Sequence, residues 1–136
     1  MVPYAIYSLQ LQYYQQVLMA AAAASDLASG NSEQILSAAS IALQNVLGLI
    51  CDPVDSQVII PCINRNFMAV SNAITSANVA NSGYNSIIPL DEVIQAMYMV
   101  GTLLAPELKG TGLGGLRATV TAQKISSNNL DVKDDS

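Results

Sequence analysis

The sequence contains no histidine and no tryptophan, and it has only five lysines and arginines among its 136 residues. The absence of histidine excludes Ser–His–Asp triads, imidazole general bases and zinc sites built on histidine. The five cations are scattered along the chain, so we expect neither a phosphate-binding surface nor a polybasic membrane patch, and no nucleic-acid partner. Any chemistry must therefore come from cysteine, carboxylate, hydroxyl, lysine, arginine or a cofactor.

Charge of either sign is also scarce. Charged residues make up 11% of the chain and hydrophobic residues 51%, whereas an ordinary soluble domain has about 25% charged residues. One interpretation is that much of the surface is covered by a partner or by a second copy. The other is a compact, alanine-rich helical domain with a neutral Ser/Asn/Gln surface, and the composition leaves both open.

The N-terminus has no lysine or arginine before its apolar residues, so no signal peptide is predicted. Polar residues such as Gln10, Gln16 and Asp26 interrupt the first apolar segment before it reaches about 20 residues, the length of a transmembrane helix. We therefore expect no membrane association and, by default, a cytoplasmic location.

The hydrophobic pattern predicts an all-α fold of about four to five helices in a single domain over residues 1–125. Asn31 and Gln34 have the spacing of a capping box at the start of the second helix. The polar, acidic tail over residues 126–136 is expected to be disordered. The helices are expected near residues 4–27, 32–49, 61–81 and 89–104, and the third carries Phe67, Val70, Ile74 and Ala77 on one face.

Both cysteines, Cys51 and Cys62, lie in a loop bounded by prolines. Pro53 cannot continue the second helix, and Pro61 can begin the third. The two thiols could be small buried apolar groups, could form a disulfide, or could bind a soft metal or an iron–sulfur cluster. The residues alone leave these three interpretations open.

The neighbouring polar residues are similarly ambiguous. Asp52 and Asp55 could act as acid–base groups or could turn the loop, and Arg65 could bind a carboxylate or lie on a helix surface. The glycine-rich stretch over residues 110–115 is not followed by Gly-Lys-Ser/Thr, so it is not a P-loop. We interpret it as a bend that lets the backbone approach another part of the chain.

The sequence Cys-Asp-Pro-Val at residues 51–54, followed by Ile-Pro-Cys-Ile-Asn-Arg-Asn at residues 60–66, resembles the C-terminal part of the α chain of bacterial iron–sulfur L-serine dehydratases. The resemblance covers about residues 19–121. It includes residues 37–50, 71–74 and 88–94, and it closes with Gly114-Gly115-Leu116.

The resemblance implies an enzyme that removes water and then ammonia from L-serine to give pyruvate. It implies a [4Fe–4S] cluster held by three cysteines, with a fourth iron that binds substrate and acts as a Lewis acid on the departing hydroxyl. By resemblance, Cys51 and Cys62 are two of the three ligands, and Asp52, Arg65 and Asn66 belong to the wall of the site.

The chain also departs from the family. Leu9 stands at the position of the first cysteine ligand, and residues 1–18 resemble no part of the family, so we interpret them as a divergent N-terminal helix that covers the surface left by missing parts. Arg117, Val120 and Ala122 stand where alanine, proline and glycine are expected.

These departures set the functional expectations. We expect the isolated chain to lack dehydratase activity, because leucine offers no ligand to a cluster. Its expected partners are further copies of itself or polypeptides that supply the missing α and β portions. The alternative is a non-catalytic helical structural protein or a remnant.

Overall fold

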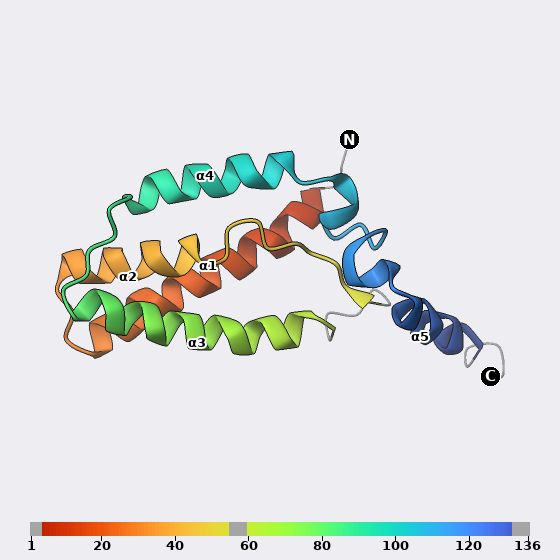
Figure 1. The fold of residues 1–136 in the computed structure, drawn as a ribbon, viewed down its shortest axis with the longest axis horizontal. Helices are drawn as coiled ribbons and strands as arrows, with labels where there is room; N and C mark the ends of the chain where they lie inside the picture. The colour runs from red at the N-terminus through yellow and green to blue at the C-terminus, as the bar shows by residue number, and fades with distance from the viewer. Residues whose placement is uncertain (1–3, 55–59, 132–136) are drawn as a thin grey trace. The chain divides into compact units, whose positions relative to one another are not determined.

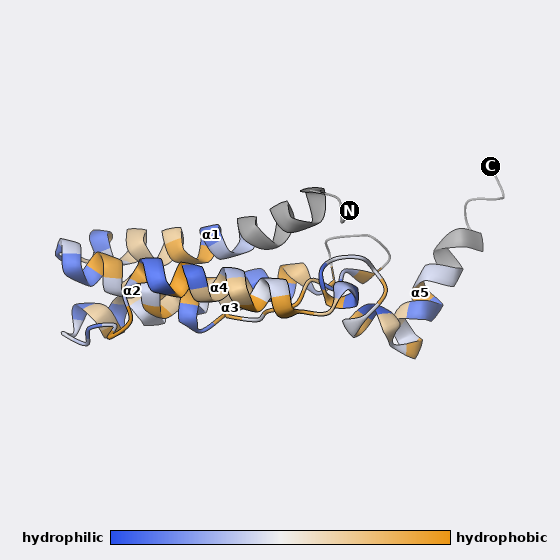
Figure 2. Ribbon diagram, turned by 90° about the horizontal axis from the view of Figure 1, so that it is seen from above, coloured by the Kyte–Doolittle hydropathy of each residue, from blue (hydrophilic) through white to orange (hydrophobic). Residues whose placement is uncertain are grey.

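A computed structural model describes residues 4–54 and 60–131, with side chains described for residues 13–54 and 60–127. The described residues form five α-helices and two short 3-10 helices, which confirms the predicted all-α class (Figure 1). None of the described helices is long and apolar enough to span a bilayer, and hydrophobic and hydrophilic residues are interspersed along them (Figure 2). The helices are α1 (Tyr4–Leu27), α2 (Ser32–Gln44), α3 (Cys62–Asn81), α4 (Leu90–Leu103) and α5 (Val120–Asp131), and the 3-10 helices are η2 (Pro106–Leu108) and η3 (Gly115–Ala118).

The described residues group into two compact units, and the single domain expected over residues 1–125 stays a prediction. The first unit, here called the cysteine unit, contains the described residues 4–10, 50–54, 60–65 and 104–131. The second, here called the helical unit, contains residues 11–49 and 66–103. Both cysteines belong to the cysteine unit.

The core of the helical unit is made largely of alanine. Small side chains let helix backbones approach closely, so the unit needs few large residues to exclude water. The buried residues come from α1, α2, the turn after α2, α3 and α4. They are Tyr14, Val17, Ala21, Ala38, Ala42, Leu43, Val46, Ala73, Ala77, Ala80 and Val93.

Helix α2 begins as predicted and ends earlier than predicted. The Asn31 side chain accepts a hydrogen bond from the Gln34 N–H, and the Gln34 side chain accepts one from the Asn31 N–H, which completes the capping box. The sequence predicted a helix to residue 49, but α2 ends at Gln44. The backbone then tightens into turns after the C-cap residue Asn45, and Gly48 follows with a positive φ of 79°.

One face of α3 buries small residues, and an adjacent face exposes large ones. Alanine and serine side chains, including Ala73 and Ala77, are buried. Phe67, Val70 and Ile74 are 68%, 58% and 53% exposed. The sequence predicted that these three residues share a face with Ala77. In the structure the three form an exposed apolar stripe, and the buried Ala77 shows that the stripe borders the core.

The described chain ends in a helix. In the structure α5 extends to Asp131, and Ser126 is buried, while the disordered tail expected over residues 126–136 stays a prediction. Thr119 caps this helix, because its hydroxyl accepts a hydrogen bond from the Ala122 N–H. The rest of the predicted tail, residues 132–136, lies outside the described residues.

Candidate functional site

Within the cysteine unit, both the N–H and the carbonyl oxygen of Cys51 form hydrogen bonds. Its N–H donates to the Leu108 carbonyl oxygen at 2.9 Å, and its own carbonyl oxygen accepts from the Gly110 N–H at 2.6 Å. The two bonds make an isolated parallel bridge between Cys51 and Lys109. The segment that follows α2 is thereby attached to the segment that follows η2.

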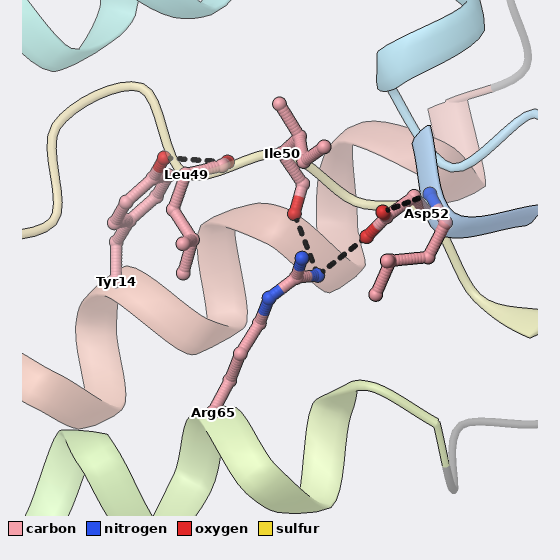
Figure 3. A network of polar contacts seen from close by, with 6 residues as sticks. Tyr14, Leu49, Ile50, Asp52 and Arg65 are labelled. Atoms are coloured by element: carbon pink, nitrogen blue, oxygen red, sulfur yellow. Dashed lines mark hydrogen bonds and ion pairs between the residues drawn. The ribbon is translucent and has the colours of Figure 1, made fainter. Parts of the chain in front are cut away.

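The next residue, Asp52, is fully buried, at 0% exposure, and its carboxylate has two partners. Oδ1 lies 2.7 Å from Nη1 of Arg65. It has no partner of regular hydrogen-bond geometry among the described residues, so the ion pair is what balances its charge. Oδ2 accepts a hydrogen bond of 2.7 Å from the backbone N–H of Leu116. Figure 3 shows the carboxylate between these two groups.

Arg65 extends the same network to the other side of Cys51. Its Nη1 also donates to the Ile50 carbonyl oxygen at 2.9 Å (Figure 3). One guanidinium therefore binds the residue before Cys51 and the residue after it. Because Arg65 lies three residues after Cys62, about one turn along α3, it connects the two cysteine-bearing segments.

The two thiols are half-buried, and neither cysteine is in a disulfide. Burial raises the pKa of the Cys51 thiol, and the neighbouring Cys62 raises it as well. The Arg65 guanidinium acts in the opposite direction, and the Asp52 carboxylate adds a smaller upward shift of that pKa.

Gly115 lies directly against Asp52. Its φ is 64°, a left-handed value that favours glycine, and a Cβ placed on it would come within 2.5 Å of Asp52 Oδ2. The predicted close approach of the glycine-rich bend thus occurs, and Asp52 is the residue that it approaches.

The predicted site residues divide into three groups. Cys51, Asp52, Cys62 and Arg65 are brought together in the cysteine unit. Asn66 is exposed, and its side chain makes no hydrogen bond to another described residue. Asp55 lies outside the described residues, as does the side chain of Leu9.

Sequence reasoning missed the Leu116 N–H as a partner of the site. The one available signal was the Gly-Gly pair before it. Glycine at residues 114 and 115 permits a tight approach but does not identify what is approached.

The donor set matches part of a cluster site. Thiolates are the usual ligands of iron–sulfur clusters, and Cys51 and Cys62 provide two. The full sequence has no third cysteine and no histidine. Within the described ranges, no group of three or more Cys, His, Asp or Glu side chains could hold a metal ion. A site with three thiolates therefore does not fit these 136 residues alone.

The helical unit has a separate cavity of about 490 Å³ next to α2 and the start of α4. Part of its polar lining is hydrogen-bonded within the protein: Ser40 hydrogen-bonds to the Ser86 hydroxyl and the Ile88 carbonyl oxygen, and Gln44 donates to both serine hydroxyls. None of the predicted site residues lines this cavity.

Comparison with known proteins gives a consistent result. A model of the family described as serine dehydratase alpha chain matches residues 17–117. The chain is 49% identical over 107 residues to a probable L-serine dehydratase alpha chain of Bacillus subtilis, and 50% identical over 107 residues to the L-serine dehydratase alpha chain of Peptoniphilus asaccharolyticus. It is 50% identical over 103 residues to a probable alpha chain of Latilactobacillus sakei. No solved structure matches the chain.

The coverage of these matches is asymmetric. They cover 79%, 79% and 76% of this chain but only 36%, 37% and 49% of the respective relatives, so the chain spans about a third to a half of their length. The family match takes in α2, α3 and α4, both cysteines and the Gly114-Gly115-Leu116 bend. The chain belongs to the serine dehydratase alpha chain family.

Proposed function

We propose that this chain is the cysteine-bearing part of an L-serine dehydratase alpha chain and supplies two thiolates, from Cys51 and Cys62, to a [4Fe–4S] cluster. In this proposal Asp52 and Arg65 support the ligands without binding iron, and Asn66 lies at the wall of the site. The complete protein converts L-serine to pyruvate and ammonia, in the cytoplasm.

The observation that supports the proposal is the buried ion pair between Asp52, which follows Cys51, and Arg65, which lies three residues after Cys62. Arg65 bonds to the residues on both sides of Cys51 while standing one turn after Cys62. Buried ion pairs are costly to build unless each charge is well partnered, so their presence beside two thiols suits a site that must hold its shape.

The isolated chain is proposed to be inactive as a dehydratase. Two thiolates fall short of the three that the family's cluster requires, and the match covers only 36% of the Bacillus subtilis relative. The third ligand and the serine-binding groups would come from polypeptide outside these 136 residues.

The test is anaerobic reconstitution with iron and sulfide, followed by measurement of both per chain. The chain alone is expected to hold far fewer than the about four iron atoms of a complete cluster. Co-expressed with the segments of the Bacillus subtilis alpha chain that it does not match and with the β portion, it is expected to approach that number and to form pyruvate from L-serine.

Cys51→Ser and Cys62→Ser variants are the controls, and each should abolish the iron bound in the co-expressed sample. A full complement of iron in the chain alone, with pyruvate formation, would overturn the proposed inactivity. Failure of the co-expressed sample to hold iron would overturn the cluster assignment.

A second function, a non-catalytic oligomeric protein, is favoured by the exposed stripe of Phe67, Val70 and Ile74 on α3. Large apolar side chains that follow one another on one helix face commonly pack against another helix. Sedimentation velocity tests this function: a Phe67→Ser/Ile74→Ser variant should sediment as a smaller species than the unmodified chain. The control is Leu27→Ser, a more exposed apolar position (86%) at the end of α1. Equal sedimentation of all three would exclude self-association through α3.

A further inference from the structure

We propose that the Gly114–Leu116 bend is a positioning element for Cys51, which acts through Asp52. The proposal rests on the proposed function only for the identity of the final ligand. It assigns to Gly115 and to the Leu116 N–H a role that cysteine spacing alone does not indicate.

The first step concerns how Asp52 is held. Its two carboxylate oxygens bind groups from different elements, Arg65 of α3 and the Leu116 N–H of η3, both at 2.7 Å. A buried carboxylate with a charged and a backbone partner has little freedom to rotate. Asp52 therefore connects α3 to the C-terminal bend.

The second step concerns what this connection does to Cys51. The backbone of Cys51 is bonded to Leu108 and Gly110, and Arg65 bonds to the residues on either side of it. These bonds hold the backbone of Cys51 with respect to Arg65 in the first turn of α3, which also carries Cys62. Two thiols on segments connected in this way would offer a soft metal ion a pair of ligands.

The third step concerns Gly115. Any side chain there would meet the Asp52 carboxylate, and the φ of 64° disfavours other residues as well. Gly112 provides a natural comparison, because its φ is 71° but a Cβ on it would have no neighbour within 4 Å. Alanine at either position would have similar backbone strain, but only alanine at residue 115 would also contact Asp52.

The experiment compares Gly115→Ala with Gly112→Ala in the full chain, with Cd²⁺ as the probe and thiolate-to-cadmium absorption as the readout. The unmodified chain is expected to bind Cd²⁺ through both thiolates, with Cys62→Ser as the control that removes one. Loss of a group that orients a ligand typically weakens metal binding by about 10- to 100-fold, which is the expected effect of Gly115→Ala. Gly112→Ala is expected to bind as the unmodified chain does.

Equal Cd²⁺ affinity of the two alanine variants would overturn the proposal, as would binding by the unmodified chain through a single thiolate. Circular dichroism must show that both variants keep their helices. If Gly115→Ala does not fold, Asp52→Asn replaces it, with Asp26→Asn, an exposed carboxylate on α1, as its control. Asp52→Asn should weaken Cd²⁺ binding, and Asp26→Asn should not.

These outcomes are separable from those for the proposed function. Cd²⁺ binding that depends on Gly115, together with failure to hold iron in the co-expressed sample, would overturn the cluster assignment and leave the positioning role intact. Iron binding in the co-expressed sample, together with equal Cd²⁺ affinity of the two glycine variants, would overturn the positioning role and leave the cluster assignment intact.

Discussion

Arg65 is the group that makes a buried carboxylate tolerable. Asp52 is fully buried, and Arg65 is 18% exposed. Replacing Arg65 by methionine keeps most of the side-chain length but leaves Asp52 without its cation. Breaking a buried pair in this way costs about 3–5 kcal/mol. We expect Arg65→Met to lower the free energy of unfolding by that order, measured by urea denaturation.

The partner substitution distinguishes a charge effect from a packing effect. Asp52→Asn removes the negative charge and keeps an oxygen that can accept from the Leu116 N–H. The double variant Asp52→Asn/Arg65→Met should therefore be more stable than Arg65→Met alone. A double variant as unstable as the sum of the two single changes would contradict this electrostatic explanation.

The Cys51 thiol should be slow to react. Burial, Cys62 and Asp52 raise its pKa, with Arg65 opposing, so in the folded chain its thiolate forms above the ordinary cysteine value of about 8.5. We expect iodoacetamide to modify Cys51 more slowly at pH 8 in the folded chain than in the chain unfolded in guanidinium, with site-resolved mass spectrometry as the measurement.

The same shift predicts the sign of a stability change. The folded state retains the Cys51 proton longer than the unfolded state does, so this contribution is fully present below the ordinary cysteine pKa and is lost as the pH rises through the folded value. In Cys51→Ser that loss should disappear. A steeper decline of stability between pH 8 and 10 in Cys51→Ser would show that the direction is wrong.

At the scale of elements, α2 depends on its first turn. The Asn31 side chain binds the Gln34 N–H at 3.0 Å, and Gln34 returns a bond of 2.9 Å to the Asn31 N–H. Asn31→Ala should cost about 0.5–2 kcal/mol in urea unfolding. Ser32→Ala, an exposed change one residue later, should cost less than about 0.5 kcal/mol. Equal effects would mean that the cap contributes little.

Helix positions were predictable from the sequence because their signals are local. Asn31 with Gln34, and Pro61 before Cys62, mark helix starts through bonds and angles within four residues. The end of α2 was misplaced because Val46 and Leu49 continue the apolar pattern of a helix, while the backbone tightens before Gly48. Periodicity reports which residues are apolar and does not report where backbone bonds change.

The candidate site was predictable only in part, for the opposite reason. Cys51, Cys62 and Arg65 lie within fifteen residues and share a recognisable pattern. The partners that complete the network, Gly115 and the Leu116 N–H, are more than sixty residues away, and a backbone N–H has no sequence signature. Only the folded chain shows that the glycine bend and Asp52 meet.

At the scale of the whole molecule, the later part of the divergent N-terminal segment contributes side chains to the core. Tyr14 and Val17 belong to the core of the helical unit, and the Tyr14 hydroxyl donates to the Leu49 carbonyl oxygen at 3.2 Å (Figure 3). Deleting residues 1–18 removes both core side chains, and losing large buried side chains costs about 2–5 kcal/mol each.

We therefore expect deletion of residues 1–18 to lower the midpoint of urea unfolding strongly, and deletion of residues 1–10 to leave the core of the helical unit in place. Unfolding of the two truncated chains, followed by circular dichroism, checks this difference. If both deletions had the same effect on the midpoint, the contribution of Tyr14 and Val17 to the core would be refuted.

The bond between Asp52 and the Leu116 N–H also sets an order of events during synthesis. Its two residues are 64 positions apart. After Asp52 has been added to the chain, the ribosome must still synthesise α3, α4 and η2 before the bond can form. Contacts of such long sequence separation form late in folding. In the proposed site, Cys51 is therefore held by this bond only after Leu116 has emerged, so any metal that depends on this positioning would bind after η3 has been synthesised.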